Sequence, residues 1–254
     1  MTPNPIRKVL STIRAHQVRA LLMGGQACVF YGGAEFSRDT DLAVLPSPDN
    51  LARLREALAE LAAEPVAVPS LAERYLLRGH AVHFRCRHPE AAGVRVDIMS
   101  VMRGVQPFEE LWRRRTTFET DDGETYDLLS LPDLVAAKKT QRDKDWPMIR
   151  RMLEANYLAH RGAAETPERV AFWLRELRTP ALLAEVARRH PEAARGAAAS
   201  RAAIAAALCG DEPALEAAVA DEERRERERD REYWRPLREE LERLRHRRGE
   251  DPGE

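Results

Sequence analysis

Short apolar segments alternate with turn residues along the first half of the chain. Five of these segments are five or six residues long, which predicts β-strands. They cover residues 19–23, 41–45, 81–86, 94–99 and 125–129. Residues 50–63 instead carry leucines at helical spacing behind the start signal Ser47-Pro48-Asp49, which predicts a helix.

The second half, from Ser130 onward, has almost entirely helical patterning. It begins with Ser130-Leu131-Pro132-Asp133, which fits a capping box with proline tolerated in the first turn. Alanine-rich segments between residues 180 and 220 are predicted to pack as closely spaced helices. We therefore predict an α+β fold with an α/β domain over residues 1–129 and an all-α region over residues 130–254.

The end of the chain is predicted to form a charged C-terminal helix. Residues 221–248 are dense in Glu and Arg, and Trp234, Leu237, Leu241 and Leu244 form a narrow apolar stripe. The stripe could dock on the body of the protein or pair with another chain, and the sequence leaves both open. Pro236 is expected to interrupt or kink the helix unless a new helix starts there.

Composition excludes several classes of protein. The chain has 254 residues, of which 44% are hydrophobic, and a net charge of −1, so we expect a globular protein without a general electrostatic preference for nucleic acid or membranes. No apolar run approaches the roughly 20 residues that cross a bilayer. The cysteines lie far apart, and residues 1–19 carry basic side chains without an apolar signal core. We expect a reduced, cytoplasmic protein that does not bind membranes.

The candidate chemistry begins with Gly24-Gly25, which follow a predicted strand. Thirteen residues later come Asp39-Thr40-Asp41. Strand alternation places Asp39 and Asp41 on one face, where they can hold hard cations. The glycines let the backbone approach a ligand, and the helix after them offers N–H groups to phosphate. The alternative interpretation is that the two glycines only form a tight turn and that Asp39 and Asp41 are ordinary turn residues before a strand.

A third carboxylate is available on a later predicted strand. Val94, Val96 and Ile98 face one side of it, and Asp97 faces the other. An aspartate exposed to solvent is the alternative. Because clustered acids repel one another, we expect a site without metal to be loose or to raise the pKa of one member.

These motifs resemble the polymerase-β-like nucleotidyltransferase superfamily, whose signature is an apolar strand, Gly-Gly or Gly-Ser, and then two acids that flank one residue. The resemblance implies a mixed-sheet nucleotidyltransferase core, with Mg²⁺ as the expected cofactor and Mn²⁺ as its alternative. The implied catalytic and metal-binding residues are Asp39, Asp41 and Asp97. Gly24, Gly25 and Ser37 would contact the triphosphate of an NTP such as ATP, and Arg38 is either a phosphate ligand or a surface arginine.

A basic segment opens the helical half. On a single helix, Lys138, Arg142, Asp145 and Ile149 would share one face. A solvated charged face is the simplest interpretation. The segment is also similar to the Lys…Arg-x-Lys-Asp helix of bacterial nucleotidyltransferases related to abortive-infection toxins. That similarity implies nucleotide binding by Arg142 and by Lys138 or Lys139, between which the sequence does not choose.

The strand predicted over residues 81–86 has a basic face. Val82, Phe84 and Cys86 point to the core, and His83 and Arg85 point the other way. If this strand lies beside the one with Asp97, its basic face borders the site and favours an anionic acceptor. A solvated sheet face is the alternative.

From the resemblance we expect an enzyme that moves a nucleoside monophosphate from an NTP to a hydroxyl acceptor and releases pyrophosphate. RNA or protein is favoured over a small molecule as the acceptor, and membership of a toxin-antitoxin pair is open. The alternative is a catalytically idle nucleotidyltransferase fold that acts as a binding or antitoxin partner through its C-terminal helix, which could also mediate self-association.

Overall fold

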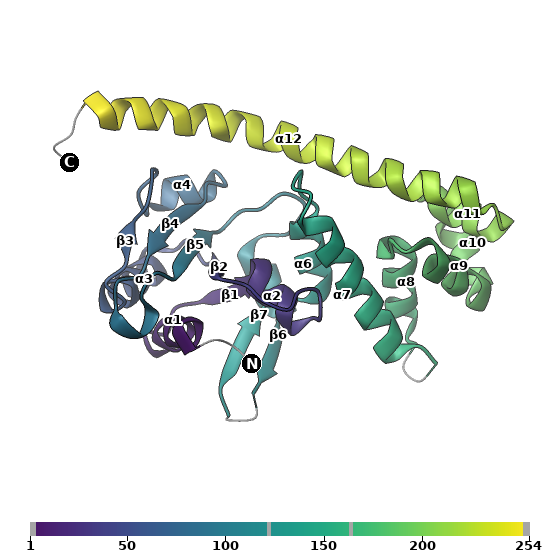
Figure 1. The fold of residues 1–254 in the computed structure, drawn as a ribbon, viewed down its shortest axis with the longest axis horizontal. Coiled ribbons are helices and arrows are strands. Elements are labelled where there is room, and N and C mark those ends of the chain that lie inside the picture. The colour runs from purple at the N-terminus through teal and green to yellow at the C-terminus, as the bar shows by residue number, and fades with distance from the viewer. Residues whose placement is uncertain (1–3, 121–122, 163–164, 251–254) are drawn as a thin grey trace. The chain divides into compact units, whose positions relative to one another are not determined.

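The computed structural model describes residues 4–120, 123–162 and 165–250 (Figure 1). Within these ranges the chain forms seven strands, twelve α-helices and one short 3₁₀ helix. The strands are β1 (Ala20–Met23), β2 (Asp39–Val44), β3 (Glu64–Pro65), β4 (Val82–Arg85), β5 (Arg95–Met99), β6 (Thr116–Glu119) and β7 (Thr125–Leu128). The helices are α1 (Asn4–Ala15), α2 (Gly24–Phe30), α3 (Pro48–Glu60), α4 (Glu73–Leu77), η1 (Pro89–Ala91), α5 (Phe108–Arg113), α6 (Leu131–Lys138), α7 (Asp145–His160), α8 (Pro167–Glu176), α9 (Pro180–Arg189), α10 (Pro191–Ala198), α11 (Ala202–Cys209) and α12 (Glu212–Glu250).

The strands form one mixed sheet in the order β3-β4-β5-β2-β1-β7-β6. β2 pairs parallel with β5 and antiparallel with β1, and β4 pairs antiparallel with β5. From α6 onward the described chain is helical. The predicted α+β fold with an all-α C-terminal region is therefore confirmed.

All five predicted strands are present, because each buries one face. In β5, for example, Val96 and Ile98 are buried while Arg95 and Asp97 are only half-buried. β3 and β6 were not predicted. β3 has two exposed residues, and no residue of β6 is fully buried, so neither strand has the apolar alternation that marks a buried face.

Helix α3 begins as predicted. Ser47 is its N-cap and accepts a hydrogen bond from the Asn50 N–H at 3.4 Å, and Pro48 occupies the first turn. Helix α1 packs against α3, and its Leu10 and Ile13 face the side of the sheet that carries Leu22 and Leu42. By alternation along β2, Asp41 points to the opposite face.

The chain divides into two compact units. Unit 1 contains residues 1–29, 35–137 and 232–254, and unit 2 contains residues 30–34 and 138–231. This division differs from the predicted boundary after residue 129, because α6 packs with the sheet. The α6 residues Leu134 and Val135 are fully buried, and Arg114 forms a bidentate ion pair with Asp133 at 2.7 and 2.9 Å.

The predicted N-cap of α6 at Ser130 is confirmed, whereas Asp133 accepts from the Ser130 hydroxyl and not from the Ser130 main-chain N–H that a capping box uses. The Asp133 N–H donates to Ser130 Oγ at 3.4 Å, and Ser130 Oγ donates to the Asp133 carboxylate at 2.6 Å. The prediction that Lys138 to Ile149 lie on one helix is wrong. α6 ends at Lys138 and α7 begins at Asp145, because Lys138, Thr140 and Arg142 all turn their side chains to Asp145.

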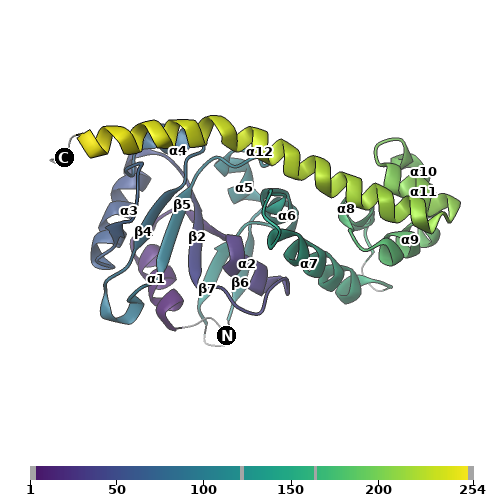
Figure 2. The ribbon, with the colours of Figure 1, turned by 45° about the horizontal axis from the view of Figure 1, so that its top comes forward.

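Helix α12 runs through Pro236 without a break, so the expected interruption is wrong. Its later part lies beside α4 in both views (Figures 1 and 2). Glu240 accepts from the buried His80 at 2.9 Å, and Leu237 of the apolar stripe is buried, so the helix is held directly after the proline. The stripe therefore docks on unit 1, while self-association stays a prediction.

Unit 2 is built from α7 to α11 and the first part of α12. Its core includes Tyr157 and Trp173, whose rings meet edge to face with centroids 5.0 Å apart. The alanine-rich helices α9, α10 and α11 pack against one another, as predicted. None of the helices in the described part of the chain combines the length and hydropathy that crossing a bilayer requires.

Candidate functional site

The carboxylates of β2 and β5 meet on one face of the sheet. The parallel register pairs Asp41 directly with Asp97, and Asp39 lies two residues before Asp41 on the same face. Neighbouring strands are about 4.8 Å apart, so side chains paired in this way lie within reach of a common ligand. The structure thus places on one face of the sheet the three acids that the sequence singled out.

Gly24 lies directly against Asp41. It has φ of +67°, and a Cβ at this position would stand 1.9 Å from Asp41 Oδ2. The contact arises because β1 and β2 pair Met23 with Asp41. The next residue, Gly24, therefore lies beside the Asp41 carboxylate. Only glycine fits both the left-handed backbone and the carboxylate beside it.

Gly25 and Ser37 complete this side of the site. A Cβ on Gly25 would stand 2.7 Å from Ser37 Oγ, and that hydroxyl donates to the Asp39 carbonyl oxygen at 3.2 Å. The strand-to-helix turn and the entry to β2 are therefore in contact. Arg38 is exposed, and its guanidinium lies 5.8 Å from the centre of the Phe36 ring. Its role in phosphate binding stays a prediction.

Replacing Gly24 with Ala is expected to lower the free energy of unfolding by about 3 kcal/mol, from left-handed strain and displacement of the Asp41 carboxylate. The matched change Gly25→Ala should have an effect below about 1 kcal/mol, because the Ser37 hydroxyl can turn away. Urea unfolding of the two variants measures the difference. Equal effects would contradict the close contact between Gly24 and Asp41.

Asp97 has two basic partners, His83 and Arg95. His83 Nδ1 lies 2.8 Å and Arg95 Nε 2.7 Å from Asp97 Oδ1, and the β4–β5 register pairs His83 with Asp97. Burial raises the pKa of Asp97, but hydrogen bonds and charge from His83 and Arg95 outweigh it, so the pKa lies below its ordinary value. The expectation was a loose site or a raised pKa on one of the three acids. Asp97 is not the member with a raised pKa, because these partners outweigh the effect of burial.

The donor set fits a hard divalent cation. It consists of carboxylate oxygens, and Asp97 is held in the ionised form that a metal ligand needs. Gly24 leaves room for the Asp41 carboxylate itself, which a Cβ at position 24 would displace. In the described ranges, no three His, Cys, Asp or Glu side chains are arranged so that they could hold a metal ion as they stand. Side-chain rotation at this face would have to accompany binding.

Lys138, Lys139 and Arg142, the basic residues predicted to bind nucleotide from the helical half, belong to unit 2 and have carboxylate partners there. Lys138 Nζ and Arg142 Nε each lie 2.8 Å from the Asp145 carboxylate, and Lys139 Nζ lies 2.7 Å from Glu176. The Lys138 and Asp145 side chains are 7% and 0% exposed, so this pair is buried. Nucleotide binding by these residues stays a prediction.

Sequence reasoning missed Arg95 as a site residue. A signal was present, since Arg95 lies two residues before Asp97 and so shares its face. His83 was recognised only as part of a basic face. That face does border the site, since β4 pairs with β5. In comparisons with known proteins, the chain matches no family model and no curated protein.

Proposed function

We propose that the protein is a nucleotidyltransferase that depends on divalent metal and moves a nucleoside monophosphate from an NTP to a hydroxyl acceptor. The observation that carries this proposal is the register of Asp41 beside Asp97, with Gly24 held at φ +67° against the Asp41 carboxylate. A Gly-Gly turn packed on paired strand carboxylates is the arrangement that the sequence motif implies. A cytoplasmic location belongs to the same proposal.

In this proposal, Asp39, Asp41 and Asp97 hold Mg²⁺ or Mn²⁺. When bound, the cations would lower the pKa of the acceptor hydroxyl and neutralise the triphosphate and the pyrophosphate leaving group. Gly24 and Gly25 bring the main chain close to the triphosphate without steric hindrance, and Ser37 offers a hydroxyl beside them. Arg95 and His83 keep Asp97 ionised before the cations bind.

The acceptor proposed is RNA or protein. Support comes from the face of β4 and β5 beside the acids, which presents His83, Arg85 and Arg95. Of these, Arg85 is exposed and lies opposite Arg95 in the register. Adjacent cations attract a phosphate-rich acceptor, so RNA is the first acceptor to test.

A second candidate function is a catalytically idle fold that binds a partner. The ion pairs of Asp97 with Arg95 and His83 favour it, because a guanidinium can neutralise a carboxylate where an active enzyme uses a metal ion. In that case the acids would serve stability, and the protein would bind neither Mn²⁺ nor nucleotide.

The deciding experiment incubates the purified protein with each α-labelled NTP and Mg²⁺, in separate mixtures of total RNA, cell protein and small metabolites. The double variant Asp39→Asn/Asp41→Asn is the control. We expect label in one fraction only with the unchanged protein, which identifies the base and the acceptor class. Absence of transfer in every fraction, together with absence of Mn²⁺ and nucleotide binding, would favour the idle fold.

A further inference from the structure

A cavity opens on the face of the sheet opposite the acids. Its volume is about 270 Å³, close to the lower end of small-molecule sites. It exists because β1 and β7 pair at one register position only, Leu22 with Leu128, whereas β1 and β2 pair at four. The β6–β7 hairpin diverges from β1 before that point, and α1 does not fill the gap.

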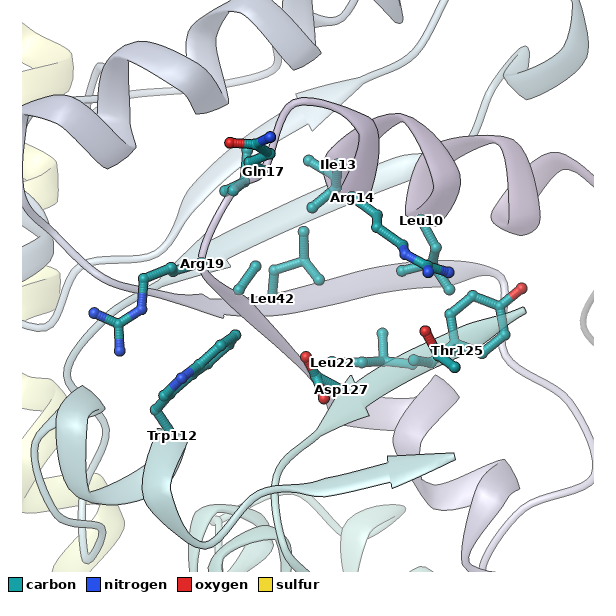
Figure 3. A pocket seen from close by; sticks show the side chains of 13 residues that line it. Leu10, Ile13, Arg14, Gln17, Arg19, Leu22, Leu42, Trp112, Thr125 and Asp127 are labelled. Atoms are coloured by element: carbon teal, nitrogen blue, oxygen red, sulfur yellow. The ribbon is translucent and has the colours of Figure 1, made fainter. Parts of the chain in front are cut away.

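The floor of the cavity is apolar, while polar side chains contribute to its rim. Leu22 and Leu42 form its floor and are each 2% exposed, and Leu10 and Ile13 of α1 are buried beside them. Figure 3 shows Trp112 toward one end of the opening and Arg14 toward the other. An apolar ring of a ligand would lie over this floor, between Trp112 and Arg14.

The Trp112 wall is fixed in place. Its ring stacks on Phe108 with centroids 5.8 Å apart, and the guanidinium carbons of Arg19 and Arg115 lie 4.9 and 4.3 Å from the indole centre. Cations on an aromatic ring and a stacked neighbour restrict its rotation. A ligand would therefore enter a largely preformed site, which favours binding.

Within the described ranges, most charged side chains at the rim of the cavity are paired with an opposite charge, and Arg14 is not. Asp127 accepts from Arg115 Nε at 3.0 Å, and Arg19 forms a bidentate pair with Glu109 at 2.7 and 2.8 Å. Arg14 has no carboxylate within ion-pair distance among the residues that the structure describes. The rim thus offers one uncompensated cation above an apolar floor.

We infer that this cavity binds a small aromatic carboxylate, with its ring on Leu22 and Leu42 and its carboxylate at Arg14. The neutral pairs at the rest of the rim do not compete for the anion, and a volume of about 270 Å³ suits a small ligand. This site stands independently of the proposed transferase activity, because it lies on the other face of the sheet.

The test is calorimetric titration of the full chain with 2-naphthoate and with its neutral counterpart 2-naphthamide. We expect 2-naphthoate to bind with a Kd on the order of 1 mM and the amide about fivefold more weakly. Arg14→Gln should remove this preference, whereas Arg188→Gln, a change of an exposed arginine on α9 in unit 2, should leave it intact. Ala20→Leu should fill the cavity and weaken binding of both ligands.

A variant could lose binding because it no longer folds, so a second measurement uses the unchanged protein. Hydrogen exchange of the unchanged protein should slow on addition of 2-naphthoate in residues 10–22, 112–120 and 123–127, which contain most of the lining. Three results would each overturn the inference. They are equal affinity for the two ligands, unchanged affinity in Arg14→Gln, and absence of both heat and protection.

Discussion

Replacing Asp41 with Asn is expected to lower the rate of nucleotidyl transfer about a thousandfold or more, while the protein stays folded. Asn keeps the volume of Asp beside Gly24 and removes the charge that would bind a cation opposite Asp97. The rate of label transfer under single turnover measures the loss, and circular dichroism checks the fold.

Asp49→Asn is the matched control, because Asp49 lies exposed in the first turn of α3, away from the site. It should transfer label at the normal rate. Mn²⁺ titration gives a readout that does not depend on catalysis, and Asp41→Asn should weaken Mn²⁺ binding. Normal turnover in the Asp41 variant would show that Asp41 is not a metal ligand.

Replacing Lys138 with Met is expected to destabilise unit 2 by about 3 kcal/mol, since it leaves the buried Asp145 carboxylate without its ammonium partner. Thr140 and Arg142 still donate to Asp145, which keeps the loss at the lower end for a broken buried pair. Urea unfolding is followed by tryptophan fluorescence in a background in which Trp112 and Trp234 of unit 1 are replaced by Phe, so that the signal comes from Trp146 and Trp173, which are buried in unit 2.

Lys144→Met changes a neighbouring exposed lysine and should alter stability by no more than about 0.5 kcal/mol. The double variant Lys138→Met/Asp145→Leu removes both charges and should regain much of the loss. If Lys138 serves nucleotide binding instead, its replacement would raise the nucleotide KM and leave the unfolding curve unchanged.

The stability difference between the unchanged protein and Lys138→Met should depend on pH. Burial raises the pKa of Asp145, but Lys138, Thr140 and Arg142 outweigh it, so the folded pKa lies below the ordinary value. A lowered carboxyl pKa contributes stability above the ordinary pKa of about 4, and that stability is lost as the pH falls further. The difference should therefore be full at pH 6 and shrink below about pH 4.

The sequence predicted those parts of the fold that rest on local periodicity. Strands with one buried face, such as β4 and β5, leave an alternating pattern, whereas the edge strand β6 buries no residue fully and leaves none. The helix over Lys138 to Ile149 was predicted from spacing alone. It is interrupted because Asp145 collects side-chain hydrogen bonds, and such contacts leave no periodic signal.

The candidate site was predictable to the extent that it depends on alternation within a strand. Asp39 and Asp41 share a face for that reason, and the glycine turn precedes them in the chain. The ion pair between His83 and Asp97 depends instead on the register of β4 against β5. A single sequence does not fix the pairing of strands separated by a loop, so the lowered pKa of Asp97 could not be foreseen.

Unit 1 is assembled from three separate segments of the chain, and the last of them starts at residue 232. On a ribosome, the sheet strands emerge long before that segment does. Until α12 is synthesised, Gly79 lacks its neighbour Tyr233 and His80 lacks its partner Glu240. The nascent protein therefore exposes an unfinished surface until synthesis of its final helix, and a chain truncated before residue 232 would keep that surface open permanently.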